Sequence, residues 1–167
     1  NRVAETYNLG VSTINAMYED DKDQLWLASS SGIYYLTSDG VKMVDDEGIS
    51  GYNIGNISGY DGTIYATANN DVLIRVDENG EITVTSKSSY GIDDINSLYI
   101  DENGTRYYGS AGYSILTINS KGKVSVISTG SLHGINKIYN DGEKIWILAD
   151  DGVGYITSGN KIVNVES

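Results

Sequence analysis

The segment Ile14-Asn15-Ala16-Met17-Tyr18 decides the fold, because similar segments return at regular intervals along the 167-residue chain. The three returns are Ile54-Gly55-Asn56-Ile57-Ser58, Ile95-Asn96-Ser97-Leu98-Tyr99 and Ile135-Asn136-Lys137-Ile138-Tyr139. The successive spacings are 40, 41 and 40 residues. A fixed period of this length is typical of repeat architectures, in which each repeat is one supersecondary unit.

Each repeat continues through a turn into a second strand with an aromatic residue at its centre. These strands are Leu25-Trp26-Leu27, Ile64-Tyr65-Ala66, Arg106-Tyr107-Tyr108 and Ile145-Trp146-Ile147. A third strand with largely alternating apolar residues follows, over 33–36, 72–76, 114–118 and 153–156. A turn suited to positive φ, such as Asp39-Gly40, then precedes a short fourth strand. Four strands in a meander make one propeller blade.

The sequence therefore predicts an all-β fold, a β-propeller of four four-stranded antiparallel blades with essentially no helix. We expect one partial propeller domain over 1–167, with blades at about 13–46, 53–87, 94–129 and 134–165. Residues 1–10 are expected to form the outer strand of a preceding blade. Since the fourth repeat has its own outer strand over 161–165, we expect a part of a larger ring, or an arc completed by dimerisation. A closed four-bladed ring and a β-solenoid are the alternatives.

Composition excludes several classes of function. A net charge of −12 opposes binding to nucleic acid or to an anionic membrane surface. The absence of Cys excludes disulfides, thiolate catalysis and zinc-thiolate sites. No apolar stretch approaches the length needed to cross a bilayer, so no membrane insertion is expected within this segment. No cofactor motif is present, and no cofactor is expected.

The first repeat runs over residues 14–29, with Trp26 in the second strand, and continues with Gly32-Ile33-Tyr34-Tyr35-Leu36. In these residues it resembles the two-component regulator propeller repeat. The fourth repeat is similar, while the second and third carry Tyr65 and Tyr107 in place of Trp. The resemblance implies a ligand-sensing region of a bacterial extracytoplasmic receptor, membrane-anchored and joined to a histidine kinase or diguanylate cyclase domain outside this chain.

Three functions remain open at this point. The first is the non-catalytic sensing or interaction module that the resemblance implies. The second is an adhesin or protein scaffold, which would also use the blade edges. The third is an enzyme similar to streptogramin lyases, with His133, the single histidine, as general base. Because no nucleophile and base pair can be assembled from one His and no Cys, we expect no enzyme and assign no catalytic residue.

Ligand-binding residues are expected on one rim of the propeller. The connections between blades and the turns between second and third strands share this rim, where loops of a rigid scaffold commonly bind ligands. Tyr rings stack on sugar C–H surfaces, and amides or carboxylates accept hydroxyl hydrogens, so a carbohydrate or peptide ligand is expected. The candidate residues are Tyr52, Asn53, Asn70, Tyr90, Asp93, Tyr113, His133, Asp150 and Asp151.

Other conspicuous residues have structural explanations. Trp26, Trp146 and the repeated Ile14, Ile54, Ile95 and Ile135 are expected in the core between blades. The acidic turns 20–23 and 101–104 contain several oxygen ligands for Ca²⁺, but their spacing does not match the twelve-residue calcium loop. Turn formation selects the same residue types, so no metal site is assigned.

Overall fold

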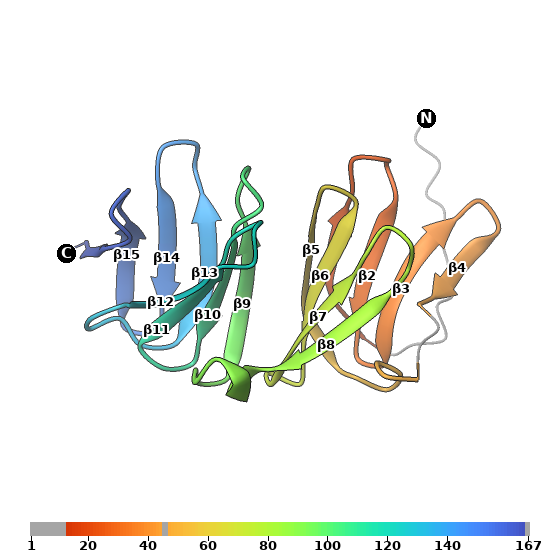
Figure 1. Ribbon diagram of the computed structural model, residues 1–167, viewed down its shortest axis with the longest axis horizontal. Helices are drawn as coiled ribbons and strands as arrows, with labels where there is room; N and C mark the ends of the chain where they lie inside the picture. The colour runs from red at the N-terminus through yellow and green to blue at the C-terminus, as the bar shows by residue number, and fades with distance from the viewer. Residues whose placement is uncertain (1–12, 45–46, 166–167) are drawn as a thin grey trace.

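The computed structural model describes residues 13–44 and 47–165, which form sixteen β-strands and one short 3₁₀ helix. The strands are β1 Ile14–Glu19, β2 Leu25–Ser29, β3 Gly32–Thr37, β4 Gly40–Met43, β5 Ile54–Tyr60, β6 Thr63–Ala68, β7 Val72–Val76, β8 Ile82–Ser86, β9 Ile95–Ile100, β10 Arg106–Ser110, β11 Ser114–Ile118, β12 Val124–Ser128, β13 Ile135–Asn140, β14 Ile145–Ala149, β15 Gly152–Ile156 and β16 Ile162–Asn164. The helix η1 spans Lys87–Ser89 and lies between β8 and β9, at the lower edge of Figure 1.

The strands form four antiparallel sheets of four consecutive strands each. The sheets are β1 to β4, β5 to β8, β9 to β12 and β13 to β16. The predicted fold class, all-β with four-stranded antiparallel blades, is confirmed. The tight hairpins follow from residues that tolerate positive φ. Between β5 and β6, Asp61 and Gly62 have φ of 49° and 71°, which matches the twist of the flanking strands. Asn69 and Asn70 do the same between β6 and β7, with φ of 53° and 57°.

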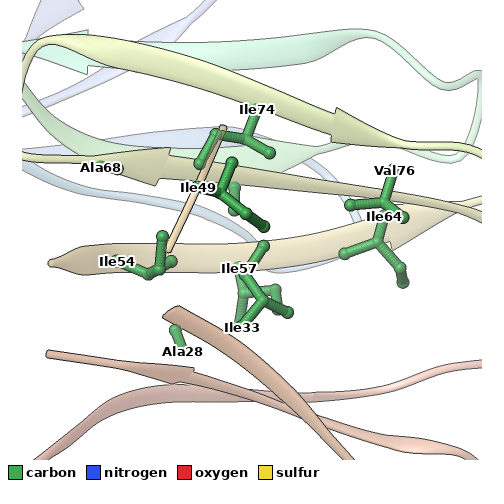
Figure 2. Close-up of a cluster of buried hydrophobic side chains, with 10 residues drawn as sticks. Ala28, Ile33, Ile49, Ile54, Ile57, Ile64, Ala68, Ile74 and Val76 are labelled. Atoms are coloured by element: carbon green, nitrogen blue, oxygen red, sulfur yellow. The ribbon is translucent and has the colours of Figure 1, made fainter. Parts of the chain in front are cut away.

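The core lies between successive sheets rather than inside any one of them. Figure 2 shows the cluster between the first two sheets, where Ala28 and Ile33 of the first meet Ile54, Ile57 and Ile64 of the second. Comparable clusters join the second sheet to the third and the third to the fourth. Because alternate residues of a strand point to opposite faces, each inner blade buries both faces.

The four sheets form an open arc. The inner strands β1, β5, β9 and β13 each contact the next along the chain, and among the described residues no comparable contact joins β13 to β1. Figure 1 shows the first and fourth sheets at opposite ends of the long axis. A four-bladed ring closed by the described strands is therefore not observed. The expected outer strand over 1–10 lies outside the described residues, and completion by a second copy stays a prediction.

The open ends correct two expectations about the core. Ile54, Ile95 and Ile135 are at most 1% exposed, but Ile14 is 36% exposed because no described blade precedes it. Trp26 packs against the first cluster, whereas Trp146 belongs to no core cluster of the described residues. It lies instead on the outward face of the last sheet, 5.5 Å from Tyr155 between ring centroids.

Within the described ranges, no helix is both long and apolar enough to cross a membrane.

Candidate functional site

The connections between blades and the turns that follow each second strand meet at one rim, as the sequence predicts. Backbone hydrogen bonds join them: the Asn69 N–H donates to the Asn53 carbonyl at 2.9 Å, and the Gly134 N–H donates to that of Gly112 at 3.0 Å. The Asp150 N–H likewise donates to the His133 carbonyl at 3.0 Å. These bonds make the rim a set of mutually supported loops, which presents side chains from separate parts of the chain on one surface.

An open hollow of about 470 Å³ lies on this rim where the third blade meets the connections on either side of it. Its lining comes from three separate segments of the chain: Lys87, Ile92, Asp93 and Asp94; Ala111, Gly112 and Tyr113; and His133. The hollow therefore brings together three of the predicted site residues, Asp93, Tyr113 and His133. Its size is within the range of small-molecule sites in proteins.

Two glycines allow carboxylates to approach the backbone at this site. A Cβ atom at Gly112 would lie 1.9 Å from Asp93 Oδ2, and one at Gly134 would lie 2.3 Å from Asp150 Oδ2. Neither position can carry a larger residue without moving the carboxylate. The two glycines therefore leave room for Asp93 and Asp150 to lie close to the backbone of the rim.

His133 contacts an aromatic ring and a carboxylate through its imidazole, and a second carboxylate through its backbone. Its ring centroid is 4.9 Å from that of Tyr113, and the two rings are tilted by 60°. Its Nδ1 lies 3.9 Å from Asp150 Oδ2, and its backbone N–H donates to Asp151 Oδ1 at 2.9 Å. Asp150 also accepts a 2.6 Å hydrogen bond from the Asn136 amide. Tyr113 and Asp150 thus flank the imidazole, Asp151 holds the His133 backbone, and the His133 side chain stays 46% exposed.

The hollow is acidic. Lys87 forms a charged hydrogen bond with Asp94, which raises the pKa of its ammonium group, and it also lies 3.9 Å from Asp71 Oδ1. This lysine is therefore already paired with carboxylates of the protein. Asp93 contributes a further carboxylate to the lining. An ionised carboxylate accepts hydrogen bonds and cannot donate them, so the site suits a ligand that offers hydroxyl or amine hydrogens.

Four other predicted residues lie outside this hollow. Tyr52 and Tyr90 are half-buried and pack against the first and third core clusters respectively. The Asn53 side chain accepts a hydrogen bond from Asn15 at 2.9 Å, and the Asn70 carbonyl accepts from the Ile95 N–H at 2.9 Å. The structure therefore does not bring these four to the hollow.

Sequence reasoning missed Lys87, Asp94 and Gly112. Lys87 lies in η1, where no helical turn was expected, and its pairing with Asp94 depends on how the connection folds back. The adjacent acids Asp93-Asp94 were a usable signal, because both lie in the same connection. Nothing in the sequence near Gly112 indicates that a carboxylate from another segment rests on it.

The acidic turns considered for Ca²⁺ use their carboxylates within the protein. Asp20 Oδ1 accepts from the backbone N–H groups of Lys22 and Gln24, and its Oδ2 accepts from the Trp26 indole at 2.9 Å. Asp101 serves its own turn in the same way, and its Oδ2 accepts from the Tyr107 hydroxyl at 3.2 Å. Within the described residues, no group of three or more His, Asp or Glu side chains has the arrangement of a metal site.

Comparison with known proteins establishes the fold. Neither a family model nor a curated protein matches the sequence. Among solved structures, the extracellular domain assigned to a hybrid two component system of B. thetaiotaomicron is similar over 98% of this chain, with a TM-score of 0.77 and 13% identity. Virginiamycin B lyase from Staphylococcus aureus is similar over 90% of this chain, with a TM-score of 0.71 and 19% identity.

The computationally designed Ika4 protein is a third similar structure, with a TM-score of 0.69 and 15% identity. This chain covers 54% of the lyase and 24% of the signalling domain, but 100% of the designed protein. The chain thus spans about half of the lyase and a quarter of the signalling domain. These similarities establish a propeller fold and leave the ligand to be inferred from the site itself.

Proposed function

We propose that this chain is a non-catalytic ligand-sensing module of a bacterial extracytoplasmic, membrane-anchored signalling receptor, and that its ligand is a neutral carbohydrate. The hollow beside Tyr113 carries the proposal. Tyr113 is 54% exposed, and its ring stands next to carboxylates that accept hydroxyl hydrogens. An exposed ring face beside acceptors is the combination that a sugar needs, because sugars present C–H surfaces and hydroxyl groups together.

The structural similarity supports the receptor context. The matching domains of B. thetaiotaomicron are named as extracellular parts of two component systems, and their propellers superpose on nearly the whole of this chain. A ligand at the rim changes signalling only if it binds one arrangement of the receptor more tightly than the other. The loops that line the hollow come from both sides of the third blade, so a ligand there contacts several connections at once.

The test is a thermal-shift screen with neutral oligosaccharides. A ligand at about 100 times its dissociation constant stabilises the folded state by about 2.7 kcal/mol, which raises Tm by several degrees in a chain of this size. Tyr113→Ala should abolish the shift. Tyr139→Ala is the matched control, because Tyr139 is also 54% exposed but lies on the open face of the last blade. No shift with any sugar, or an equal loss in both variants, would contradict the proposal.

A lyase similar to virginiamycin B lyase is the second candidate. The observation that favours it is His133, which stands beside Asp150 at the edge of an open hollow. In the lyase from Staphylococcus aureus, a His-to-Ala variant described as catalytically inactive has been solved with quinupristin. Incubation of this chain with quinupristin, followed by mass spectrometry, tests the candidate. Turnover that is lost in His133→Ala would establish catalysis and replace the sensing proposal.

A further inference from the structure

A second hollow, of about 520 Å³, lies between the first and second blades at the opposite edge from the rim. Trp26 and Tyr35 of the first blade line it, with their ring centroids 5.3 Å apart. Ile64 and Val76 of the second blade form part of the facing wall. We call this hollow the first groove. Its charged lining consists of Asp20, Asp77, Glu78 and Lys22, so carboxylates outnumber cations.

The equivalent groove between the second and third blades is filled by an arginine of the protein. The strand registers place Tyr65 at the position of Trp26 and Arg106 at the position of Ile64. The Arg106 guanidinium lies 4.6 Å from the Tyr65 ring centroid. It also donates to the carbonyls of Ile118 and Asn119, at 3.3 and 3.1 Å. Only about 100 Å³ of hollow remains there.

The last blade repeats the pattern of aromatic residues and a cation. Trp146 and Tyr155 occupy the positions of Trp26 and Tyr35, and the Lys144 ammonium lies 4.4 Å from the Tyr155 centroid and 5.4 Å from that of Trp146. Within the described residues, no cation stacks on Trp26 or Tyr35. The first groove therefore has the aromatic pair Trp26 and Tyr35, but no Arg or Lys of the described residues stacks on it as Arg106 and Lys144 do on their aromatic partners.

A backbone acceptor in the first groove also lacks the side-chain donor that is present at two equivalent positions of the other blades. At the end of the third strand of a blade, the Leu36 carbonyl accepts from the Gln24 amide, and that of Ile118 accepts from Arg106. Val76 holds the same position in the second blade, and no side chain of the described residues donates to its carbonyl. Ile64 pairs with Val76 as Arg106 pairs with Ile118, and its side chain has no hydrogen-bond donor.

We propose that the first groove binds an arginine side chain of a peptide, with the guanidinium stacked on Trp26 and donating to the Val76 carbonyl, as Arg106 does in the next groove. A guanidinium stacks on aromatic faces and offers several donors in one plane, so it satisfies both features together. The carboxylates of Asp77 and Glu78 favour a positive charge at this edge. This site is separate from the rim hollow and does not depend on the sugar proposal.

The fluorescence of Trp26 tests the inference. The chain has two Trp residues, so Trp146→Phe leaves Trp26 as the single reporter. We expect acetyl-Gly-Arg-Gly amide to change its emission saturably. The same peptide with citrulline, which has the shape of arginine without the charge, should bind at least tenfold more weakly. Equal binding of the two peptides, or no saturable change with the arginine peptide up to millimolar concentration, would overturn the proposal.

A variant whose own side chain occupies the first groove provides a second test. Ile64→Arg places a guanidinium in the first groove as Arg106 does in the next one, so in the folded variant it should weaken arginine-peptide binding at least tenfold. Ile64→Leu is the matched control and should bind as the parent does. Circular dichroism and Tm verify that both variants are folded. Binding that persists in folded Ile64→Arg would show that the peptide sits elsewhere and would overturn the assignment.

Discussion

The ring of Tyr18 lies against Gly59 of the next blade, so closely that a Cβ atom at Gly59 would come within 2.5 Å of Tyr18 Cε1. Tyr60 rests on Gly104 of the third blade with the same 2.5 Å approach. In the first two junctions, therefore, a ring from one blade lies against a bare backbone position of the next. Such contacts add to the apolar clusters between the sheets and make blade spacing sensitive to a single methyl group.

Gly59→Ala should lower the free energy of unfolding by about 1–3 kcal/mol, the usual cost of overpacking a tight contact. Gly55→Ala is the control, because a Cβ atom there would meet nothing closer than Thr67 Oγ1 at 3.9 Å. Neither glycine has positive φ, so backbone strain does not separate the two variants. Urea unfolding followed by circular dichroism measures both. Equal stabilities would show that the Tyr18 ring moves without cost.

Ile14 and Ile54 provide a comparison of one repeat position in two surroundings. Ile54→Ala should cost about 2–5 kcal/mol, as expected for a cavity in a packed core. Ile14→Ala should cost clearly less, because Ile14 is 36% exposed and Ile54 is 0% exposed. The two unfolding curves are measured at the same protein concentration. An equal loss in both variants would mean that another chain or segment covers Ile14 in solution.

The same comparison shows what sequence can and cannot predict. The period and the turn residues specify four-stranded blades, because strand pairing and hairpin geometry are local. They assign Ile14 to the core along with its three counterparts, since burial depends on whether a neighbouring blade is present. The prediction that Trp146 lies in the core is wrong for the same reason. The position of a residue in the repeat predicts which face of the sheet its side chain lies on. Whether that side chain is buried depends on whether another blade packs against that face.

The candidate site was likewise predictable from the sequence only in part. The topology of a meander predicts which loops share the rim, and Asp93, Tyr113 and His133 do line one hollow there. Tyr52, Asn53 and Asn70 fit the same rule, but none of the three lines this hollow, and their role in ligand binding stays a prediction. Some polar residues of the rim are already paired within the protein, as Lys87 is with Asp94. This pair forms because the connection between the second and third blades folds back on itself, and the sequence alone does not predict it.

Asp141 should make stability depend on acidic pH. The Trp146 indole N–H donates to its Oδ2 at 2.6 Å, and together with the Lys144 and Glu143 backbone N–H groups it lowers the pKa of Asp141 to about 2. A carboxyl with a lowered pKa in the folded state stabilises it above its unfolded pKa. That contribution is lost as pH falls from about 4 towards 2.

Asp141→Asn removes this charge, so it should be less stable than the parent at pH 6 and should approach the parent as pH falls to about 2. Urea unfolding at several pH values measures the difference between the two proteins. Asp39→Asn is a control in another exposed turn, where the carboxylate accepts from the Ser38 hydroxyl at 3.4 Å. A parent-to-variant difference that stays constant from pH 6 to 2 would contradict the prediction.

The two open faces of the arc should bind each other between copies of the chain. Tyr139, Trp146 and Tyr155 on the last blade occupy the positions of Tyr18, Trp26 and Tyr35. In the first junction, Tyr18 and Trp26 pack against the cluster shared with the second blade. On the last blade the corresponding face leaves Leu148 41% exposed, and on the first blade Met17 is 66% exposed. Exposed apolar faces of this kind mark interaction surfaces.

We expect two arcs to associate head to tail, the last blade of each against the first blade of the other, in a species of twice the chain mass by sedimentation velocity. Leu148→Asp or Met17→Asp alone should shift the chain towards monomer, since each places a charge in both junctions. Val126→Asp is the control, because Val126 is 51% exposed but lies on the outer strand β12.

A mixture of the Leu148→Asp and Met17→Asp variants distinguishes head-to-tail association from the pairing of like faces. In a mixed pair, one junction joins the unaltered last blade of one variant to the unaltered first blade of the other, while the second junction holds both substitutions. Association should therefore recover in part on mixing, because one junction keeps its apolar contacts. Like-face pairing would show no such recovery, since each variant would still associate through its own unaltered face. A parent chain that stays monomeric at high concentration would exclude both arrangements.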